Sequence, residues 1–478
     1  MTTAETTAAT PSAATEEYER RPVPASALKD WRSFLGMYAG EHTAGTELMI
    51  GPLFLAAGVS AIDLVAGLLL GNLLAVLSWR FICAPVATQA RLTLYYQLEK
   101  ICGRGLVTVY NLANGVLFCF LAGAMITVSA TAVGIPFNMP MPGLQDATPD
   151  SWVWVAVVLA IGVVISVVAA RGYSTVARFA NIAAPWMILV FLALGLVAVQ
   201  QLNVNSWAEF WAVLGRGGEP LPGQLKFSFW HVLFFAWFCN AAMHVGMADL
   251  TILRYAKHPR VGWTTASGMY IGHFMAWIAA ALLYAVYLRS PEAAGYLTAG
   301  EAPPVAPGPM AYQALGITGL ILVIVAGWTT ANPTIYRAGL AFQAIMPKAS
   351  TTVVTLLAGA LATLAGIFPA FAMKLLGFVA TYGFVLAPVG AIIFFNHFFA
   401  PRIGLTANWA EANGRTFNPA VLAAWLISLL FFYWIAEQQA IFLSFLTLPA
   451  WLACGALFLL FSKLQTKYLA SKPQTTHA

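Results

Sequence analysis

Charged residues are scarce in this chain. Of its 478 residues only 9% are Asp, Glu, Lys or Arg, whereas 60% are hydrophobic. Soluble proteins carry about 25% charged residues, so this composition excludes an ordinary soluble domain. The mean hydropathy of +0.77 indicates instead a chain embedded in a membrane. The net charge of +6 then indicates basic cytoplasmic loops rather than nucleic-acid binding.

Cysteine pairs and soluble catalytic motifs are missing as well. The five cysteines form no Cys-x-x-Cys pair and mostly lie in apolar runs, where cysteine acts as a small core residue. They are Cys83, Cys102, Cys119, Cys239 and Cys454. There is no phosphate-binding glycine loop, no Gly-x-Ser-x-Gly and no His-Glu-x-x-His. We therefore expect no disulfide, no bound cofactor and no enzyme activity.

Long apolar runs are abundant. A membrane-spanning helix needs about 20 apolar residues, and twelve runs of this kind can be placed. They cover residues 32–56, 61–84, 106–134, 151–170, 176–200, 228–252, 264–289, 311–331, 351–372, 374–398, 419–436 and 440–462. The sequence therefore predicts an all-α integral membrane protein with 12 transmembrane helices.

Basic residues orient these spans. If the N-terminus is cytoplasmic and the loops alternate, 20 of the 24 Lys and Arg residues, Arg337 among them, fall on the cytoplasmic side. We expect a multi-pass protein of the cell inner (plasma) membrane with both termini cytoplasmic. Residues 1–28 lack the apolar core of a signal peptide and are predicted to be a disordered cytoplasmic tail, and residues 466–478 a second tail.

The first span contains an unusual polar patch, with Glu41 and His42 near its middle and Glu47 following. A charge at this depth costs about 2.5–3.5 kcal/mol on insertion scales, so it indicates function. Three glycines weaken the helix here: Gly36, Gly40 and Gly45. Such a patch is tolerated only where it is buried in protein or lines a cavity, which predicts a broken helix at a solute or ion site.

Several roles are open to these polar residues. Glu41 could accept a substrate N–H or carry a coupling proton; the alternative is a packing pair with His42 or a basic neighbour. Glu47, on another face, is expected near the outer interface in contact with water.

The sixth span is also polar. Asn240 and His244 are four residues apart, so one helical face could present both to a substrate. Asp249 and Arg254 are predicted to form a cytoplasmic structural pair or gate. Because spans one and six each begin a set of five, the arrangement suggests a five-plus-five inverted repeat. Its parts are residues 29–200 and 201–400, with 401–465 as two extra helices.

The eighth span carries hydroxyl groups beside a proline. Thr329, Thr330 and Asn332 offer oxygen donors, and Pro333 frees a carbonyl near Thr329. These oxygens suit a small hard cation; the alternative is that they mark the cytoplasmic helix end.

Three motifs resemble those of a known family. Residues 328–340 (Trp-Thr-Thr-Ala-Asn-Pro-Thr-Ile-Tyr-Arg-Ala-Gly-Leu) are similar to the helix-eight motif of cytosine permeases. Residues 249–255 resemble the Asp-Phe-Ser/Thr-Arg-Tyr signature of purine/cytosine and hydantoin permeases, with an insertion. Residues 387–396 resemble their helix-ten motif, with Asn396 replacing an acid. Most of residues 30–465 thus resembles the nucleobase:cation symporter-1 family, which has the LeuT-type fold.

The resemblance implies a site. Sodium would lie between the helix-one backbone, including Gly36 and Gly40, and the Thr329 and Thr330 oxygens. A planar heterocycle would stack between an aromatic residue of helix three and Trp237. The helix-three candidates are Phe120 and Phe118, and the helix-eight amide corresponds to Asn332 or Thr334.

The predicted function is therefore a symporter, driven by Na⁺ or H⁺, for a nucleobase or related nitrogenous heterocycle. Spans 1, 2, 6 and 7 would rock against spans 3, 4, 8 and 9. The expected partners are a small-molecule substrate and lipid, without nucleic acid or an obligate protein partner. The alternatives are a LeuT-type symporter for another polar solute, such as an amino acid, and a non-transporting membrane sensor or enzyme.

Overall fold

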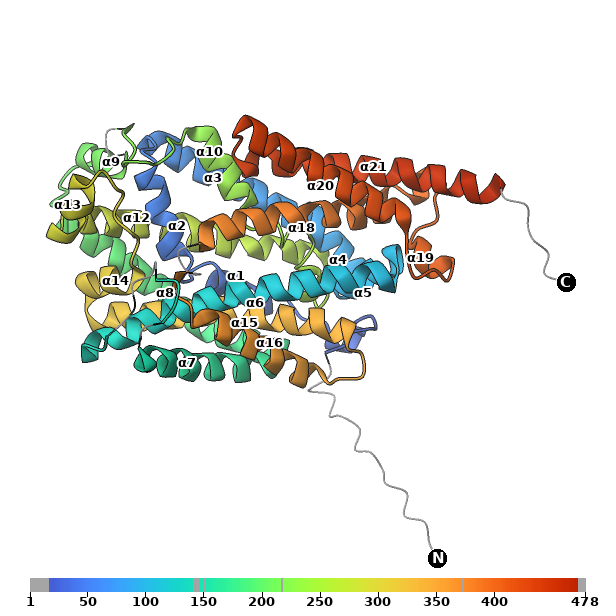
Figure 1. Ribbon diagram of the computed structural model, residues 1–478, viewed down its shortest axis with the longest axis horizontal. Helices are drawn as coiled ribbons and strands as arrows, with labels where there is room; N and C mark the ends of the chain where they lie inside the picture. The colour runs from blue at the N-terminus through green and yellow to red at the C-terminus, as the bar shows by residue number, and fades with distance from the viewer. Residues whose placement is uncertain are drawn as a thin grey trace, which may run out of the picture.

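The chain folds into a helical bundle, seen in a computed structural model that describes residues 17–140, 142, 146–149, 151–215, 218–370 and 374–471 (Figure 1). Within these ranges, nine helical segments are long and apolar enough to cross a membrane. Three shorter apolar helices accompany them: α2 (Glu47–Ala56), α10 (Phe229–Phe238) and α16 (Thr351–Gly366). Each of the twelve falls on a predicted span, so the chain is an all-α, multi-pass membrane protein.

The first span is broken where the sequence predicts. Helix α1 (Arg32–Glu41) ends at Glu41, residues 42–46 are irregular, and α2 resumes at Glu47. The interruption contains Gly45 and two β-branched threonines, which all disfavour a helix. Glu47 occupies the first turn of α2, where a carboxylate suits the helix dipole.

The sixth span is broken too. After α10 the chain is irregular over residues 239–249 and then forms the short α11 (Leu250–Leu253). Met247 adopts a left-handed conformation with φ 68°. Helix α18 (Leu375–Phe398) packs so closely on this segment that a side chain at Gly390 would collide with the Val245 carbonyl. The Trp451 indole donates to the same carbonyl oxygen at 3.0 Å, which satisfies a backbone group freed by the break.

The helices pack as two groups. In the bundle group, α3 (Ala61–Ser78) lies along α10, and α2 lies along α12 (Met275–Tyr287). In the scaffold group, α6 (Arg104–Gly134) lies along α15 (Ile317–Ile345) and α16, and α16 lies along α7 (Trp152–Ala170). Helices α1 and α11 belong to the bundle group, and α8 (Tyr173–Gln201) contacts helices of both groups. This grouping corresponds to spans 1, 2, 6 and 7 against spans 3, 4, 8 and 9.

The remaining helices connect these elements or follow them. They are α4 (Ala84–Ala90), α5 (Leu94–Cys102), α9 (Trp207–Gly215), α13 (Pro291–Thr298), α14 (Pro307–Leu315), α19 (Trp409–Ala412), α20 (Pro419–Gln439) and α21 (Leu443–Ser471). A π-helical segment, η6 (Ser267–Phe274), leads into α12.

The eighth span is longer than predicted. The expected limits were 311–331, but α15 runs from Ile317 to Ile345 and passes through Pro333 without ending. Arg337 therefore lies inside the helix and is 1% exposed. Its predicted place in a cytoplasmic loop is wrong. The reason is that buried carboxylates, described below, compensate its charge in the interior.

The ends of the chain also differ from the prediction. Residues 17–28, assigned above to a disordered tail, are packed: Val23 is buried and its backbone N–H donates to the Arg91 carbonyl at 3.0 Å. Helix α21 continues to Ser471, beyond the predicted limit of 465. The rest of both predicted tails, residues 1–16 and 472–478, lies outside the described residues.

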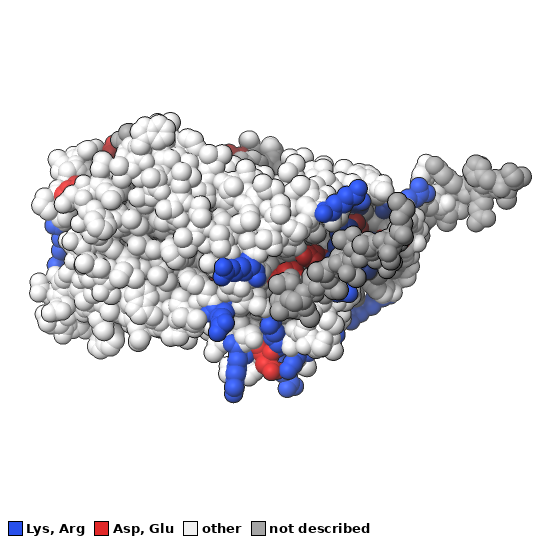
Figure 2. Space-filling view, turned by 90° about the horizontal axis from the view of Figure 1, so that it is seen from below, with Lys and Arg blue, Asp and Glu red and all other residues white. Residues whose placement is uncertain are grey.

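Charged side chains gather at one end of the bundle. In Figure 1, α5 and α19 lie at the right-hand end of the bundle, and α9 and α13 lie at the left-hand end. Figure 2 shows the Lys and Arg side chains of one face mostly in its right-hand half, beside a broad uncharged area. We call the end with α5 and α19 the basic end.

All five cysteines lie within the described residues, and each is a buried free thiol. None forms a disulfide.

Candidate functional site

A cavity lies where the two broken helices meet. Its walls come from the breaks after α1 and α10, from α2 and η6, and from α6, α15 and α18. The lining residues are Glu41, His42, Thr46, Glu47, Ile50, Leu121, Cys239, Asn240, Ala242, Met243, His273, Thr330, Thr334 and Tyr382. Four predicted site residues therefore meet at one place: Glu41, His42, Asn240 and Thr330.

Glu41 is paired with an arginine from the other helix group. Arg337 of α15 donates to the two Glu41 carboxylate oxygens at 2.6 and 3.3 Å. It also donates to Asp249, just before α11, at 2.7 Å. One scaffold cation thus joins two bundle-group carboxylates inside the protein, and the Glu41 carboxylate is compensated by a basic partner.

Asp249 completes this network. Its other oxygen accepts the Tyr38 hydroxyl at 3.0 Å and the Trp79 indole N–H at 2.7 Å. The predicted pair of Asp249 with Arg254 is wrong: Arg254 donates instead to the backbone carbonyls of residues 17 and 18, at 2.7 and 2.8 Å. Residues five apart on a helical turn point in different directions, which separates the two side chains.

His42 occupies the helix break in a fixed orientation. Its Nδ1 lies 2.8 Å from the Tyr38 carbonyl oxygen, and its ring lies 4.8 Å from the His273 ring. Side chains at Gly268 or Gly272 would collide with His42. These two glycines of η6 therefore make room for the imidazole at the cavity wall.

The expected common face of Asn240 and His244 is absent because the chain is not helical there. Asn240 lines the cavity, and its amide nitrogen lies 3.3 Å from His273 Nε2. His244 instead contacts the Trp237 carbonyl at 3.0 Å and packs on the Trp79 ring at 4.7 Å, outside the cavity lining.

The predicted stacking pair is not assembled. Phe120 is 37% exposed on the outer face of α6, whereas Phe118 is buried against the Tyr382 ring at 5.4 Å. Trp237 donates its indole N–H to Ser78 at 2.9 Å and stacks on Phe238, away from the cavity lining. On α6, the cavity-lining residue is Leu121, one position beyond Phe120, because successive helical residues point about 100° apart.

Two hydroxyl groups and a backbone carbonyl lie close together on α15. The Thr329 and Thr330 hydroxyls lie 2.9 and 3.4 Å from the Ala326 carbonyl oxygen. Gly45 in the helix-one break approaches Gly327, since a side-chain carbon there would lie 3.4 Å from the Gly327 nitrogen. The first-helix break therefore lies against the turn of α15 that precedes Thr329 and Thr330.

Most of the other residues predicted to bind the cation or the substrate do not line the cavity. Gly36 and Gly40 lie within α1 and pack on Asn181 and Ala180 of α8. Asn332 is buried outside the cavity lining, and its amide has no hydrogen-bond partner among the described residues. Thr334, the other predicted counterpart of the family amide, does line the cavity.

Glu47 is one of the cavity residues that sequence reasoning missed. It was expected near the outer interface, yet it is 2% exposed and lines the cavity beside His273. The signal available in the sequence was its place directly after the helix break, because the first residue of a half-helix faces the same cavity as the break.

Solved structures share this fold. Mhp1, a nucleobase-cation-symport-1 family transporter, in a closed conformation with bromovinylhydantoin bound, matches with TM-score 0.72 and 14% identity over 94% of this chain and 96% of its own. The chain has the fold of this transporter. The inward-facing conformation of Mhp1 matches with TM-score 0.63 and 15% identity, covering 94% and 95%. The predicted all-α, LeuT-type fold class is confirmed.

A second kind of transporter matches as well. A Na⁺-coupled sialic acid symporter in a substrate-bound outward-open state has TM-score 0.64 and 12% identity, covering 91% of this chain and 89% of its own. No protein-family model and no curated protein matches the sequence.

Proposed function

We propose that the chain is a secondary active transporter. It is a cation-coupled symporter that imports a nucleobase or related small nitrogenous heterocycle, such as cytosine, a purine, a hydantoin or allantoin. The solute crosses unchanged, so the protein is not an enzyme.

The observation that carries this proposal is the cavity between two broken helices. Irregular backbone at membrane depth is tolerated where it lines a cavity, and broken helices form the substrate sites of many transporters. Asn240 offers both a donor and an acceptor to a ring amide, and it lines the cavity with Glu41 and His42.

Alternating access follows from the two helix groups. Residues 29–200 and 201–400 would be the two inverted repeats, and residues 401–465 would lie outside them. Arg337 of the scaffold group would hold Glu41 and Asp249 of the bundle group while access at the basic end is closed. Opening that end would require these ion pairs to separate.

The coupling cation is Na⁺ at the Thr329 and Thr330 hydroxyls with the Ala326 carbonyl. Oxygen atoms are the ligands that hard cations prefer, and the first-helix break lies against this part of α15. The backbone of Gly36 and Gly40 belongs to the helix whose end would supply further carbonyl oxygens.

The protein would lie in the cell inner (plasma) membrane with both termini cytoplasmic. The basic end supports this orientation because Lys and Arg resist translocation. Its partners would be the solute and surrounding lipid, without nucleic acid or an obligate protein partner.

A second candidate is a symporter for a polar solute that is not a heterocycle, such as an amino acid. The unassembled pair of Phe120 and Trp237 favours it, because a planar ring would lack its two stacking faces. The likeness to a sialic acid symporter supports the same candidate.

Uptake of radiolabelled solutes by proteoliposomes tests both candidate functions. Radiolabelled nucleobases, hydantoins, amino acids and sialic acid would be offered at two sodium concentrations and two pH values. We expect gradient-driven accumulation of a heterocycle, abolished by Asn240→Ala and retained by Asn205→Ala, which changes an exposed asparagine. Accumulation of only non-heterocyclic solutes would select the second candidate. Binding without transport in tight vesicles would overturn both.

A further inference from the structure

Glu47 is a buried carboxylate that faces the cavity among neutral donors. The Trp277 indole N–H donates to one oxygen, and the Thr46 hydroxyl donates to the other at 2.8 Å. Among the described residues, the basic group that reaches within 4.0 Å of this carboxylate is the imidazole of His273, with Nε2 at 3.9 Å. In the part of the chain that the structure describes, no arginine compensates Glu47 as Arg337 compensates Glu41.

His273 is itself incompletely satisfied. It is 1% exposed, and its Nδ1 has no hydrogen-bond partner among the described residues. Its Nε2 lies 3.3 Å from the Asn240 amide, and its ring stacks on Trp277 at 4.2 Å. A buried imidazole with one unpartnered nitrogen, whose other nitrogen lies 3.9 Å from a buried carboxylate, forms with it a site that can take up a proton.

Other polar groups line the cavity around Glu47 and His273. Glu41 and His42 of α1 line the same cavity, but Glu41 is bound to Arg337 and His42 to a backbone carbonyl. Cys239 and Tyr382 also face the cavity. Burying an unpaired charge is costly, so Glu47 is stabilised when a positive charge or a proton neutralises it.

We propose that Glu47 with His273 is the proton-binding site of this transporter. A proton enters from the outer water, binds the Glu47 carboxylate beside His273, and leaves to the cytoplasm after the cavity reopens. No other bond changes. This inference rests on the proposed transport function and adds a proton to the cation at Thr329 and Thr330.

Proteoliposomes with an imposed pH gradient test the assignment. With an inward gradient of one pH unit and no sodium gradient, wild-type protein should accumulate solute up to about tenfold, as expected for one proton per solute. A pH dye in the lumen should report acidification on solute addition. Glu47→Gln should still exchange solute but accumulate none, while Asp63→Asn, at the exposed start of α3, should behave as wild type.

Each result has a separate meaning. If wild-type protein transports no solute, the transport function itself fails. If sodium drives uptake but the pH gradient has no effect, or Glu47→Gln still accumulates solute with protons, only the proton site fails. Accumulation of a cationic solute independent of pH would assign Glu47 to the substrate and overturn the proposal. If Glu47→Gln does not fold, His273→Asn supplies the test, with the same loss of proton-driven accumulation expected.

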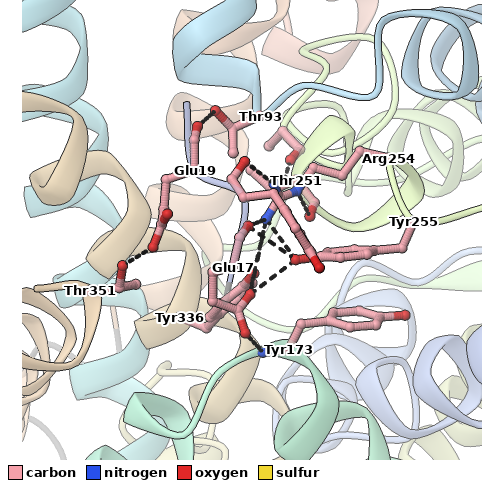
Figure 3. Close-up of polar contacts among 11 residues, drawn as sticks. Glu17, Glu19, Thr93, Tyr173, Thr251, Arg254, Tyr255, Tyr336 and Thr351 are labelled. Carbon is pink, nitrogen blue, oxygen red and sulfur yellow. Dashed lines mark hydrogen bonds and ion pairs between the residues drawn. The ribbon is translucent and has the colours of Figure 1, made fainter. Parts of the chain in front are cut away.

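A different observation carries a second inference: the N-terminal segment is bound across the basic end. Figure 3 shows Glu17 between three tyrosines. Its carboxylate accepts the Tyr336 hydroxyl at 2.6 Å, the Tyr255 hydroxyl at 3.1 Å and the backbone N–H of Tyr173 at 3.0 Å. Tyr173 is the first residue of α8, whose dipole also favours a carboxylate there.

Arg254 holds the backbone of the same segment. It is fully buried, donates to the carbonyls of Glu17 and Tyr18, and lies 4.0 Å from the Glu17 carboxylate (Figure 3). The Glu19 carboxylate accepts the hydroxyl of Thr351 of α16, and its carbonyl accepts that of Thr93 at 3.2 Å. Arg20 donates to the Ala344 carbonyl at 2.9 Å.

These contacts connect the two helix groups. Arg254 and Tyr255 follow α11 in the bundle group, whereas Tyr336, Ala344 and Thr351 belong to the scaffold group. We infer that residues 17–23 form a strap that fastens the basic end shut. The strap must leave Arg254 or Tyr336 before the two groups separate there.

Hydrogen exchange of the full chain in detergent tests the strap. Glu17→Gln and deletion of residues 1–23 should each speed amide exchange at least tenfold in α11 and the first turn of α8. Two control variants should leave amide exchange in α11 and α8 unchanged. One is the deletion of residues 1–16, and the other is Asp30→Asn, which breaks an exposed ion pair with Lys257. Unchanged exchange in both strap variants would overturn the inference. If the longer deletion does not fold, Glu17→Gln alone decides.

Discussion

Two buried carboxylates lie on either side of the first-helix break, and their surroundings differ. Glu41 ends α1 and is bound by Arg337, whereas Glu47 begins α2 and is bound by neutral donors beside His273. Both line one cavity. The Glu41 charge joins the two helix groups, whereas the Glu47 charge is open to a ligand.

The largest expected effect comes from removing the shared cation. Arg337→Leu would leave Glu41 and Asp249 buried without a basic partner, and breaking such a pair costs about 3–5 kcal/mol. We expect a large fall in the thermal unfolding midpoint in detergent. The triple variant Arg337→Leu, Glu41→Gln, Asp249→Asn should recover much of that loss. If the single variant is as stable as wild type, Glu41 is not held by charge pairing.

Neutralising the two acids separately compares them directly. Glu41→Gln should destabilise the fold by about 1–3 kcal/mol, because a charged hydrogen bond to Arg337 is weakened. Glu47→Gln should leave the unfolding midpoint unchanged or raise it, since it removes an uncompensated buried charge. Equal destabilisation by both variants, measured by thermal unfolding, would contradict the difference between a compensated Glu41 and an uncompensated Glu47.

A smaller effect is expected at the proposed sodium site. Thr330→Ala removes one of the hydroxyls near the Ala326 carbonyl. We expect the sodium concentration for half-maximal uptake to rise about tenfold, equivalent to about 1.4 kcal/mol. Thr298→Ala, in exposed α13, is the matched control. Unchanged sodium dependence in Thr330→Ala would remove α15 from cation binding.

The smallest effect should come from a donor to Glu47. Trp277→Phe removes the indole N–H that stabilises the ionised carboxylate. The protonated form then persists to higher pH, so the pH of half-maximal uptake should rise by up to about one unit. Uptake measured across pH checks this. A shift to lower pH would contradict the role of Glu47 as the proton acceptor.

A local pattern in the sequence was sufficient for the first helix break, but the break in residues 239–249 was not predicted from its residues. The glycines around Glu41 predict a weakened helix there, because their effect on a helix depends on nearby residues alone. The partner of Glu41 could not be predicted in this way. Arg337 lies 296 positions further along the chain, and the positive-inside pattern assigned it to a loop.

The sequence also did not predict which side chains point into the cavity. Phe118, Phe120 and Leu121 differ by one to three positions, yet one packs on Tyr382, one points outward and one lines the cavity. Asn240 and His244 were placed by a helical spacing that does not hold in residues 239–249. A sequence pattern locates the segment that forms the site, whereas the fold decides which of its side chains face the cavity.

The five buried thiols have a practical consequence for spectroscopy. Since every cysteine is buried, a cysteine introduced at an exposed position would be the one that reacts readily with a spin label or fluorophore. Distances between a label on α13 and one on α19 could then be followed in a chain that keeps its native cysteines.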